Sequence, residues 1–461
     1  MSIPVVAIFD VGKTNKKLFL FDEDYKIVFE RTAKFIETKD EDGDPCENLE
    51  SLRLSVFDSL REVLRKDEFD IKAINFSTYG ASLVYVDENG QAIAPLYNYL
   101  KEYPNKLKEK FYNTYGGEED FSVATASPVL GSLNSGMQLY RLKHEKPEIY
   151  KKMKYALHLP QYMSSIITGK MYSDITSIGC HTNLWNFQTD AYHDWVAEEG
   201  IDKKLPPLFP GNEVIPSSFP SDQYLTGVGL HDSSAALIPY LESFIGPFIL
   251  ISTGTWCISL NPFNDNPLTK FELTQDCLSY ITYTGKPIKA SRLFAGFEHE
   301  QEVKRIASYF NQTVGKYKTV KFNSTIMEKF LPEKSLPDYF KGLGYNYYDF
   351  SKEDLSRFKD DVEAYHYFIY TLVFKQFVST SLVLNNTNVQ RIFVDGGFSK
   401  NGIYMNLLAM AFPDTEVYAA SMAQATAMGA AVAIHKYWNK QQLPTDMITL
   451  KLFVPPVKIY S

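Results

Sequence analysis

The sequence predicts an α/β protein made of two domains that begin in the same way. The chain has 461 residues, more than one ordinary hydrophobic core contains, so two domains are expected. Short apolar stretches typical of strands are interspersed with segments of helical periodicity. A strand, a glycine-containing turn and a second strand open each half, at residues 3–22 and 248–262. We assign residues 1–222 to the first domain and residues 223–461 to the second.

The first half begins with strands and continues into helices. Apolar residues at helical spacing predict a helix at residues 48–66. Strands are predicted at residues 3–10, 16–22, 25–35, 73–77 and 83–86. Residues 133–170 are predicted to be helical, with breaks at Pro147 and Pro160. The proline-rich residues 205–220 have little periodicity and are the candidate linker.

The second half repeats the opening pattern. Residues 248–262 predict an apolar strand, a glycine turn flanked by hydroxyl side chains, and another strand. At residues 391–412 a strand leads through Gly396-Gly397 into a predicted helix, whose dipole would favour an anion. Residues 424–438 predict an alanine-rich helix that can pack closely. The two halves therefore form a structural repeat more than a sequence repeat.

The composition is that of an ordinary globular protein and argues against some classes of function. Hydrophobic residues make up 45% and charged residues 22% of the chain. The net charge of −8 and the lack of lysine or arginine blocks argue against binding to nucleic acid or anionic membrane. The four cysteines lack metal-site spacing, and no run of 18 apolar residues occurs. We expect a cytoplasmic protein with no nucleic-acid or membrane partner.

The tripeptide Gly12-Lys13-Thr14 looks like the end of a P-loop but lacks the rest of that motif. A P-loop needs a glycine five positions before Gly12, where this chain has Ala7. A P-loop also continues into a helix, whereas residues 16–22 predict a strand. The segment is therefore a tight turn between two strands, with one acid, Asp10, closing the first of them.

Three glycine-containing turns offer backbone N–H groups that could donate hydrogen bonds to a polyphosphate. Because glycine has no Cβ atom, backbone N–H groups there can approach phosphate oxygens closely. Each turn alone is better explained as an ordinary tight turn, but together they favour a triphosphate held from both sides. The residues concerned are Gly12 with Lys13, Thr14 and Asn15; Thr253 with Gly254 and Thr255; and Gly396 with Gly397.

Two aspartates each have a chemical and a structural interpretation. Asp10 could hold Mg²⁺ through water, because that ion keeps much of its hydration shell, and a turn-capping role explains it equally well. Asp232 lies in the stretch 227–237, where glycines lead into the first turn of a predicted helix. It could be a helix cap, or a carboxylate that accepts a hydroxyl proton during phosphoryl transfer. The pattern alone favours the cap.

Taken in order, these motifs resemble the FGGY family of carbohydrate kinases, which belongs to the actin–hexokinase superfamily. The resemblance spans nearly the whole chain. Residues 10–17 look like the first phosphate motif of that family, and residues 251–256 look like the second. Residues 395–401 resemble its nucleotide-binding turn, and residues 427–431 resemble its closing helix.

Among family members, residues 231–235 and 252–256 look most like those of rhamnulokinases and fuculokinases. The resemblance implies two ribonuclease-H-like domains around a central cleft, with ATP mainly on the second and the sugar mainly on the first. It implies that Asp232 is the general base for the 1-hydroxyl of a ketose such as L-rhamnulose or L-fuculose. It also implies a need for ATP and Mg²⁺, with Asp10 holding the ion through water. The sugar would contact Tyr79, Gly80, Ser82, His231 and Asp232. ATP would contact the three turns together with Lys17 and Asn401.

Several positions depart from the family pattern and leave the acceptor open. Lys13 stands where the family usually has a small or hydroxyl residue, and we expect its charge to contact phosphate. Tyr79 replaces an expected tryptophan, and Ser82 stands where rhamnulokinases carry an aspartate. Asn98-Tyr99 replaces an expected Arg-Asp pair. In the family these loops touch the sugar, so the identity of the sugar stays open.

Other functions stay open on the sequence. The chain could phosphorylate another ketose or a polyol, such as xylulose, ribulose or a glycerol-like acceptor. It could be an actin-like or chaperone-like ATPase, although the His-Asp turn and the helical insert at residues 133–200 speak against this. It could also bind a sugar without turnover. A homodimer is left open as its assembly.

Overall fold

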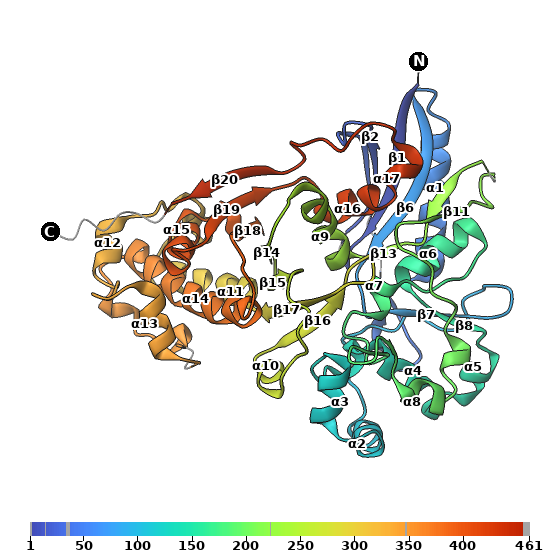
Figure 1. Ribbon diagram of the computed structural model, residues 1–461, viewed down its shortest axis with the longest axis horizontal. Helices are drawn as coiled ribbons and strands as arrows, with labels where there is room; N and C mark the ends of the chain where they lie inside the picture. The colour runs from blue at the N-terminus through green and yellow to red at the C-terminus, as the bar shows by residue number, and fades with distance from the viewer. Residues whose placement is uncertain (1, 14, 34–36, 222, 346–347, 455–461) are drawn as a thin grey trace.

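The structure is a computed structural model that describes residues 2–13, 15–33, 37–221, 223–345 and 348–454. Figure 1 shows two lobes, each built around one large sheet, with the first half of the chain on the right and most of the second half on the left. The predicted features that fall on positions outside the described residues are Thr14 of the first turn, the end of the strand predicted at residues 25–35, and residue 222 at the proposed domain boundary.

The first large sheet contains three antiparallel strands followed by two parallel ones. β1 pairs with β2 and β2 with β3, all antiparallel. On the other side, β6 runs parallel to β1, and β12 runs parallel to β6. The strands of this sheet are β1 (Ile3–Val11), β2 (Lys16–Asp22), β3 (Ile27–Ala33), β6 (Phe69–Thr78), β11 (Val214–Pro216), β12 (Leu225–Gly227) and β13 (Leu230–His231).

The second large sheet repeats this arrangement. β14 pairs with β15 and β15 with β17, both antiparallel, while β18 runs parallel to β14 and β19 parallel to β18. The shared order confirms the predicted repeat and the two ribonuclease-H-like halves. The strands are β14 (Phe248–Thr253), β15 (Cys257–Asn261), β16 (Cys277–Ile281), β17 (Pro287–Leu293), β18 (Arg391–Gly396), β19 (Glu416–Ser421) and β20 (Thr449–Phe453).

Helices cover both large sheets. In the first lobe, α1 packs on one face of the sheet, and α9 with α16 packs on the other face. The longer helices are α1 (Leu49–Leu64), α2 (Asn105–Thr114), α3 (Glu118–Thr125), α4 (Ser135–Glu145), α6 (Leu159–Thr168), α9 (Asp232–Ser243), α11 (Ala295–Tyr309), α13 (Leu336–Leu343), α14 (Asp361–Leu384), α15 (Gly402–Ala411) and α16 (Ala425–Ala433). The shorter ones are α5 (Pro147–Lys152), α7 (Ile175–Ile178), α8 (Asp194–Glu198), α10 (Lys270–Thr274), α12 (Ser324–Glu328) and α17 (His435–Trp438).

α14 is the central helix of the second lobe. It has the length and composition of a membrane-spanning helix, but 78% of its apolar window is buried inside the protein. Its apolar side chains belong to one cluster with those of α15, the inner residues of β14 and β18, and several phenylalanines. This burial is what a core helix of a globular domain shows, and it explains the apolar character of the segment without a membrane.

The structure corrects two sequence predictions in the first lobe. The predicted helical region 133–170 contains a strand, β8 (Tyr155–His158), because these residues pair antiparallel with β7 (Leu83–Val86). Residues 205–220 are not a free linker: they contribute β11, which pairs with β12 at the edge of the first sheet. Smaller two-stranded sheets join β4 (Thr38–Lys39) to β5 (Pro45–Cys46) and β9 (Trp185–Asn186) to β10 (Ala191–Tyr192).

Helix α9 connects the cores of the two lobes. Ala235 and Ile238 belong to the cluster on the first sheet, whereas Leu237 and Tyr240 belong to a cluster on the second sheet. α16 crosses it closely: a Cβ atom at Gly429 would overlap the carbonyl oxygen of Ala235. The glycine therefore permits the approach of two backbones at the junction of the lobes.

Gly429→Ala should lower the free energy of unfolding by about 2 kcal/mol, because the added methyl group must push α16 away from α9. The control is Gly342→Ala in α13, where a Cβ atom would meet only the Lys334 side chain at 3.5 Å. That change should be neutral or stabilising by up to about 1 kcal/mol, since alanine is the better helix former. Denaturant unfolding of both variants checks this; a Gly429→Ala protein as stable as the wild type would contradict the packing argument.

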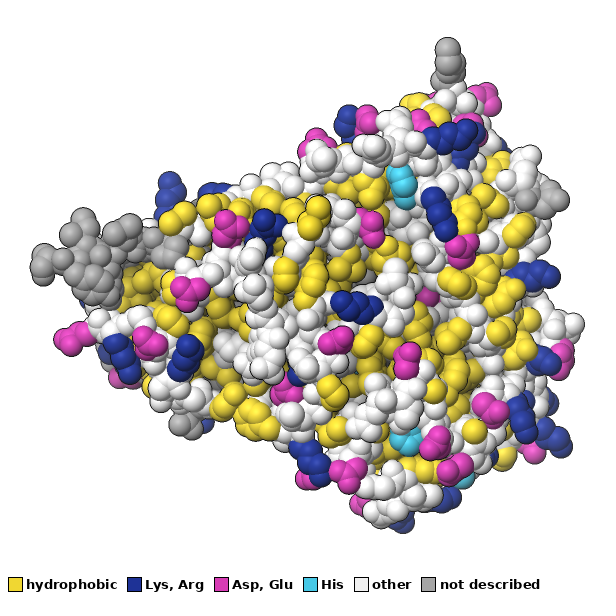
Figure 2. Space-filling model, in the orientation of Figure 1, with side chains coloured by type: hydrophobic (Ala, Val, Ile, Leu, Met, Phe, Trp, Pro, Cys, Tyr) yellow, Lys and Arg dark blue, Asp and Glu magenta, His cyan; other side chains and the backbone are white. Residues whose placement is uncertain are grey.

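The surface carries charges of both signs without segregation on the visible face. Figure 2 shows lysine, arginine, aspartate and glutamate side chains interspersed over both lobes, with hydrophobic side chains between them. Together with the net charge of −8, this face presents no continuous basic surface.

Candidate active site

The two predicted aspartates come together at the junction of the lobes. Asp10 lies near the end of β1. It is on the same face of the sheet as Val6 and Ile8, which pack against α9 and α16. Its Oδ1 accepts a hydrogen bond of 2.9 Å from the Thr426 hydroxyl of α16. Burial raises the pKa of Asp10 to about 6, although the Thr426 bond opposes this, and the nearby charge of Asp232 raises it further. The two carboxylates are therefore close enough to interact electrostatically.

Asp232 is the first residue of α9, and its half-buried side chain, 31% exposed, has a defined hydrogen-bond environment. Burial raises the pKa of its carboxyl group to about 6, an effect that hydrogen bonds from Ser233 oppose. The Nε2 atom of His231 lies 3.2 Å from Asp232 Oδ1. Burial lowers the pKa of His231 to about 4, so the ring is neutral at pH 7. This leaves an ionised carboxylate that is ready to take a proton near neutral pH.

The structure separates the two interpretations of Asp232. The cap position of α9 is occupied by His231, whose side chain makes no capping hydrogen bond. Asp232 lies one residue inside the helix, where its Oδ1 accepts from the Ser233 backbone N–H at 2.6 Å. The carboxylate thus helps to satisfy the helix start without being its cap, and the role of base stays compatible with that.

Of the predicted sugar-side residues, Gly80 lies against the ring of His231. Gly80 is needed for space, because a Cβ atom there would lie 2.7 Å from Cδ2 of the His231 ring. Tyr79 is buried, and its hydroxyl donates to Glu47 at 3.0 Å. Ser82 is buried behind it and hydrogen-bonds the Tyr79 side chain. The structure therefore places Gly80 against His231 and joins Ser82 to Tyr79, and contact of these residues with a sugar stays a prediction.

Three further side chains face the same region and were not predicted as site residues. The ring of His181 lies 6.4 Å from that of His231, and the ring of Tyr280, from the second lobe, lies 6.0 Å from it. Burial raises the pKa of Tyr99, and the charge of the nearby Asp232 raises it further. His181 has a positive φ of 41°, a strained conformation that often marks functional sites. Only Tyr99 had a sequence signal, as a departure from the family pattern.

The second and third glycine turns are hydrogen-bonded to each other. The Gly397 N–H donates to the Thr253 carbonyl at 3.0 Å, and the Phe398 N–H donates to the Thr253 hydroxyl at 3.0 Å. The same hydroxyl donates to the Asp395 carbonyl at 2.5 Å. Because this side chain is fully engaged, the predicted contact of Thr253 with phosphate would use its backbone. Gly396 has a φ of 91°, and a Cβ atom there would overlap the Thr253 carbonyl oxygen.

These turns open onto a cavity of about 550 Å³, a size that suits a nucleotide. Of the predicted ATP-binding residues, Gly254, Gly397 and Asn401 line it. The remaining lining residues were not predicted: Gly296, His299, Tyr317, Lys318, Val320, Phe398, Lys400 and Gly402.

The helix after the third turn starts later than predicted. A short 3-10 turn, Phe398–Lys400, separates Gly396-Gly397 from α15, so these glycines do not lie at a helix start as predicted. The Asn401 side chain caps α15 by accepting from the Ile403 N–H at 3.0 Å. Its amide donates to the Tyr365 hydroxyl at 2.8 Å, which fixes it in the wall of the cavity.

The first glycine turn follows β1. The Gly12 N–H donates to the Asn15 carbonyl at 2.9 Å, and the Asn15 side chain is exposed. Lys17 lies opposite Asp10 in the sheet, and its ammonium group pairs with Glu30 at 2.8 Å. The ammonium group of Lys13 points toward carboxylates on the acceptor side, 3.6 Å from Glu37. The predicted contact of Lys13 with phosphate stays a prediction.

Asp10 and Asp232 form a donor pair that fits a hydrated magnesium ion. Two interacting carboxylates favour a nearby cation, and Mg²⁺ prefers oxygen ligands while keeping several waters. Among the described residues, no group of three or more His, Cys, Asp or Glu side chains is arranged to hold a metal. The pair therefore suits an ion held largely through water, as predicted for Asp10, better than a metal held entirely by side chains.

The apparent pKa of turnover should lie near 6. Below this pH, kcat/KM for the acceptor should fall, because Asp232 must be ionised to accept a proton and its pKa is about 6. The raised pKa means that the folded protein holds this proton more tightly than the unfolded chain does. The contribution of this group to the free energy of unfolding is therefore fully present below about pH 4 and is lost as the pH rises through about 6. Protonation of Asp232 in acid therefore does not destabilise the fold. A pH–rate profile with parallel thermal melts checks this; an acid limb near pH 4 would contradict it.

Comparisons with known proteins agree with this architecture. A xylulose kinase structure from Lactobacillus acidophilus superposes with a TM-score of 0.77 at 16% identity, covering 98% of this chain and 94% of that one. A gluconate kinase structure from the same organism superposes with the same TM-score at 17% identity, covering 99% and 94%. Both likenesses concern the fold, and their equal scores do not distinguish their acceptors.

The sequence comparisons identify the family. A rhamnulokinase from Mannheimia succiniciproducens is 24% identical over 196 residues, which is 42% of this chain and only 40% of that protein. Residues 5–238 match the N-terminal domain of the FGGY family of carbohydrate kinases. Residues 245–442 match the C-terminal domain of carbohydrate kinases of the FGGY type. Both domains are present in order, so this chain belongs to the FGGY family of carbohydrate kinases.

Proposed function

We propose that this protein is an ATP- and Mg²⁺-dependent kinase that phosphorylates a hydroxyl group of a ketose. The observation that carries the proposal is the position of Asp232, a carboxylate with a pKa of about 6 at the start of the helix that joins the two lobes. Gly80, of the predicted acceptor side, lies against His231 in the first lobe, and the glycine turns of the second lobe line a nucleotide-sized cavity. This arrangement supports transfer of a phosphoryl group across the junction.

In the proposed reaction, Asp232 accepts the proton of the acceptor hydroxyl while that oxygen bonds to the γ-phosphorus of ATP. The bond between this phosphorus and the β–γ bridging oxygen breaks, which releases ADP and a sugar phosphate. The Nε2 atom of the neutral His231 ring lies 3.2 Å from Asp232 Oδ1, and Ser233 donates to the same oxygen. The backbone N–H groups of the glycine turns would stabilise the charge that spreads over the phosphate oxygens. When bound, Mg²⁺ would neutralise part of the triphosphate charge, with Asp10 as the residue that holds its water shell.

For the acceptor, we propose the primary 1-hydroxyl of a 6-deoxy ketose such as L-rhamnulose or L-fuculose. The support is local: residues 231–235 and 252–256 resemble those of rhamnulokinases and fuculokinases. The runner-up is another ketose or a polyol, because Tyr79 and Ser82 depart from the rhamnulokinase pattern at the acceptor wall.

A coupled assay of ADP release over a panel of acceptors tests the proposal. The panel contains L-rhamnulose, L-fuculose, D-xylulose, L-ribulose, D-gluconate and glycerol, each with Mg²⁺ and ATP. We expect ADP release that depends strictly on one or two of the ketoses and stops with EDTA. ADP release at the same rate without any acceptor would indicate an ATPase, and preference for gluconate or glycerol would overturn the ketose assignment.

The proposal extends to location, assembly and domain boundary. We propose a cytoplasmic enzyme, since all four cysteines are free and buried. We keep a homodimer as the proposed assembly to be tested by light scattering. We also keep residues 1–222 and 223–461 as the proposed domains; β12 and β13, which follow that boundary, pair with the first sheet.

A further inference from the structure

Glu47 is a buried carboxylate that contacts both the first glycine turn and the acceptor side of the site. Only 6% of the residue is exposed. Its Oε2 lies 3.0 Å from the Lys16 ammonium group, and its Oε1 accepts from the Tyr79 hydroxyl at 3.0 Å. The ammonium group of Lys13 lies 3.7 Å from the same Oε1. A carboxylate buried with partners on two sides ties those partners together, because losing either contact leaves a buried polar group unsatisfied.

On one side, Glu47 fixes the glycine turn through Lys16. The Lys16 side chain is 7% exposed, and its ammonium group reaches back to the turn itself. It donates to the carbonyl of Gly12 at 3.5 Å and to that of Lys13 at 3.4 Å. These carbonyls belong to the first glycine turn, which contacts phosphate in the proposed function. The charge of Glu47 thus orients the cation that braces the turn.

On the other side, Glu47 fixes the acceptor wall through Tyr79. Burial, followed by the charge of Glu47, raises the pKa of Tyr79 well above its usual value, so its hydroxyl stays protonated and donates. The Tyr79 ring lies 6.0 Å from the ring of Tyr99. Burial raises the pKa of Tyr99, and the charge of the nearby Asp232 raises it further, so Tyr99 lies close to Asp232. The network therefore runs from the glycine turn to the side chains next to the candidate base.

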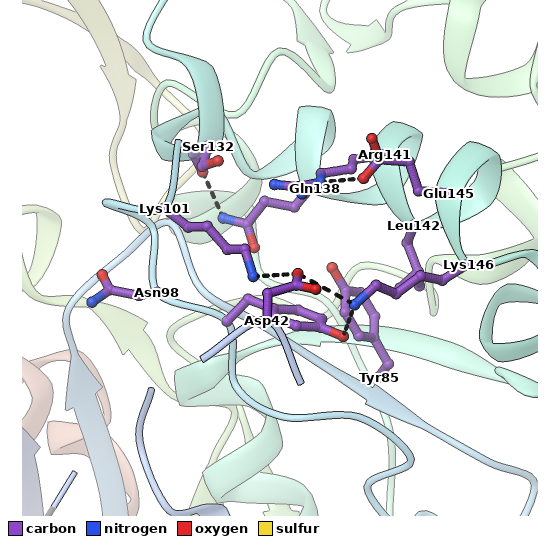
Figure 3. Close-up of a pocket in the computed structure, with 11 residues that line it drawn as sticks. Asp42, Tyr85, Asn98, Lys101, Ser132, Gln138, Arg141, Leu142, Glu145 and Lys146 are labelled. Atoms are coloured by element: carbon purple, nitrogen blue, oxygen red, sulfur yellow. Dashed lines mark hydrogen bonds and ion pairs between the residues drawn. The ribbon is translucent and has the colours of Figure 1, made fainter. Parts of the chain in front are cut away.

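The loop that carries Glu47 is itself held against the loop that carries Tyr99. Glu47 forms a backbone bridge with Leu96. The Lys101 ammonium group lies 2.5, 2.7 and 3.0 Å from three carboxylates of the first loop, those of Asp40, Asp42 and Asp44. Figure 3 shows Lys101 pointing at Asp42 from the second loop. This clamp gives Glu47 a fixed position, which a residue that transmits order between two sites requires.

We propose that Glu47 is a positioning residue that couples acceptor binding to nucleotide binding. The inference rests on the proposed function and adds a residue that the sequence motifs do not contain. An acceptor that packs on Tyr79 and Tyr99 holds the Tyr79 hydroxyl on Glu47, and Glu47 holds Lys16 on the turn. Binding of either ligand then orders groups that the other ligand needs, so each should raise the affinity for the other by the same factor.

The first arm of the test needs no acceptor. Glu47→Gln keeps an acceptor atom for Tyr79 but removes the charge that orients Lys16. Its dissociation constant for a nonhydrolysable ATP analogue with Mg²⁺, measured by calorimetry, should rise about tenfold. Glu37→Gln is the matched control, since that carboxylate is 56% exposed and, among the described residues, forms an ion pair only with Lys13, at 3.6 Å. It should bind like the wild type. Equal binding by Glu47→Gln and wild type would overturn the nucleotide side of the proposal.

The second arm measures the coupling itself with the acceptor that the panel identifies. In the wild type, saturating acceptor should tighten binding of the ATP analogue at least fivefold. Tyr79→Phe keeps the aromatic ring and the ion pair between Glu47 and Lys16. In this variant, the factor by which the acceptor tightens binding of the ATP analogue should fall toward one. Tyr97→Phe is the control, because it removes a similar tyrosine–glutamate bond, to Glu41, away from the turn. Its factor should match the wild type.

The outcomes separate this proposal from the proposed function. If no acceptor supports turnover, the kinase assignment fails while the first arm still reports on Glu47. If an acceptor is found but the wild type shows no coupling, or Tyr79→Phe keeps the full factor, Glu47 does not link the two sites. Should Glu47→Gln fail to fold, the Tyr79→Phe arm decides alone.

Discussion

Asp232→Asn should lower kcat roughly 10²–10⁴-fold, the usual contribution of a positioned proton transfer. The amide keeps the shape of the side chain and its contact with the Ser233 N–H, but it cannot take a proton from the acceptor. Proton loss can come late in phosphoryl transfer, so part of the loss would reflect a misplaced hydroxyl. Affinity for nucleotide should hardly change. Steady-state kinetics with the best acceptor and a nucleotide titration measure both quantities.

The same variant should be as stable as the wild type or more stable at pH 7.5. Burial raises the pKa of Asp232 to about 6, so ionisation of this group costs more in the folded protein than in the unfolded chain, and a neutral amide removes that cost. Asp360→Asn is the control, because Asp360 also lies at a helix start, where it accepts from the Glu363 N–H at 2.9 Å. It should keep full kcat. An Asp232→Asn enzyme with near-normal kcat would leave this residue a helix-start acceptor only.

Asp10→Asn should lower kcat by roughly 10²-fold or more and raise the Mg²⁺ concentration needed for half-maximal turnover. The amide can still accept from the Thr426 hydroxyl, so the packing of α16 on β1 should persist. The variant lacks the negative charge beside Asp232 that would help to hold the Mg²⁺ ion. Turnover measured against total Mg²⁺ at saturating ATP and acceptor gives both numbers.

Acceptor binding without nucleotide is the discriminating measurement for Asp10. Calorimetry should give the wild-type dissociation constant, because Asp10 does not line the predicted acceptor wall. Asp70→Asn is the matched control: Asp70 lies at the other end of the same sheet, its side chain is 43% exposed and it pairs with Lys72. That variant should behave like the wild type in every respect. Equal loss of acceptor affinity and turnover in Asp10→Asn would indicate a structural role.

Much of the fold was predictable because strand and turn signals are local. The two strand–glycine turn–strand openings were found from residues next to each other in sequence, and both lie where predicted, at β1–β2 and β14–β15. β8 was missed because its four residues lie between helices, and only pairing with the distant β7 makes them a strand. Residues 205–220 were misjudged for the same reason, since β11 depends on an edge offered by β12.

The candidate site was predictable where a motif marks it. Asp232 and the glycine turns carry such motifs, and the structure brings Gly254, Gly397 and Asn401 to one cavity. Glu47 has no motif, because its importance comes from Lys16 and Tyr79 approaching it through the fold. Strand alternation could have separated Lys16 from Lys17, since neighbours in a strand point to opposite faces of the sheet. It could not have shown which acid meets each lysine.

The most direct test of the central claim is phosphorus NMR of the products formed from ATP, Mg²⁺ and the preferred ketose. The account predicts a new phosphate monoester signal that grows in step with ADP and couples to the two protons of a primary carbon. Inorganic phosphate should stay at the level of a sample without enzyme. Inorganic phosphate that grows in step with ADP, with or without the ketose, would contradict the account and identify an ATPase.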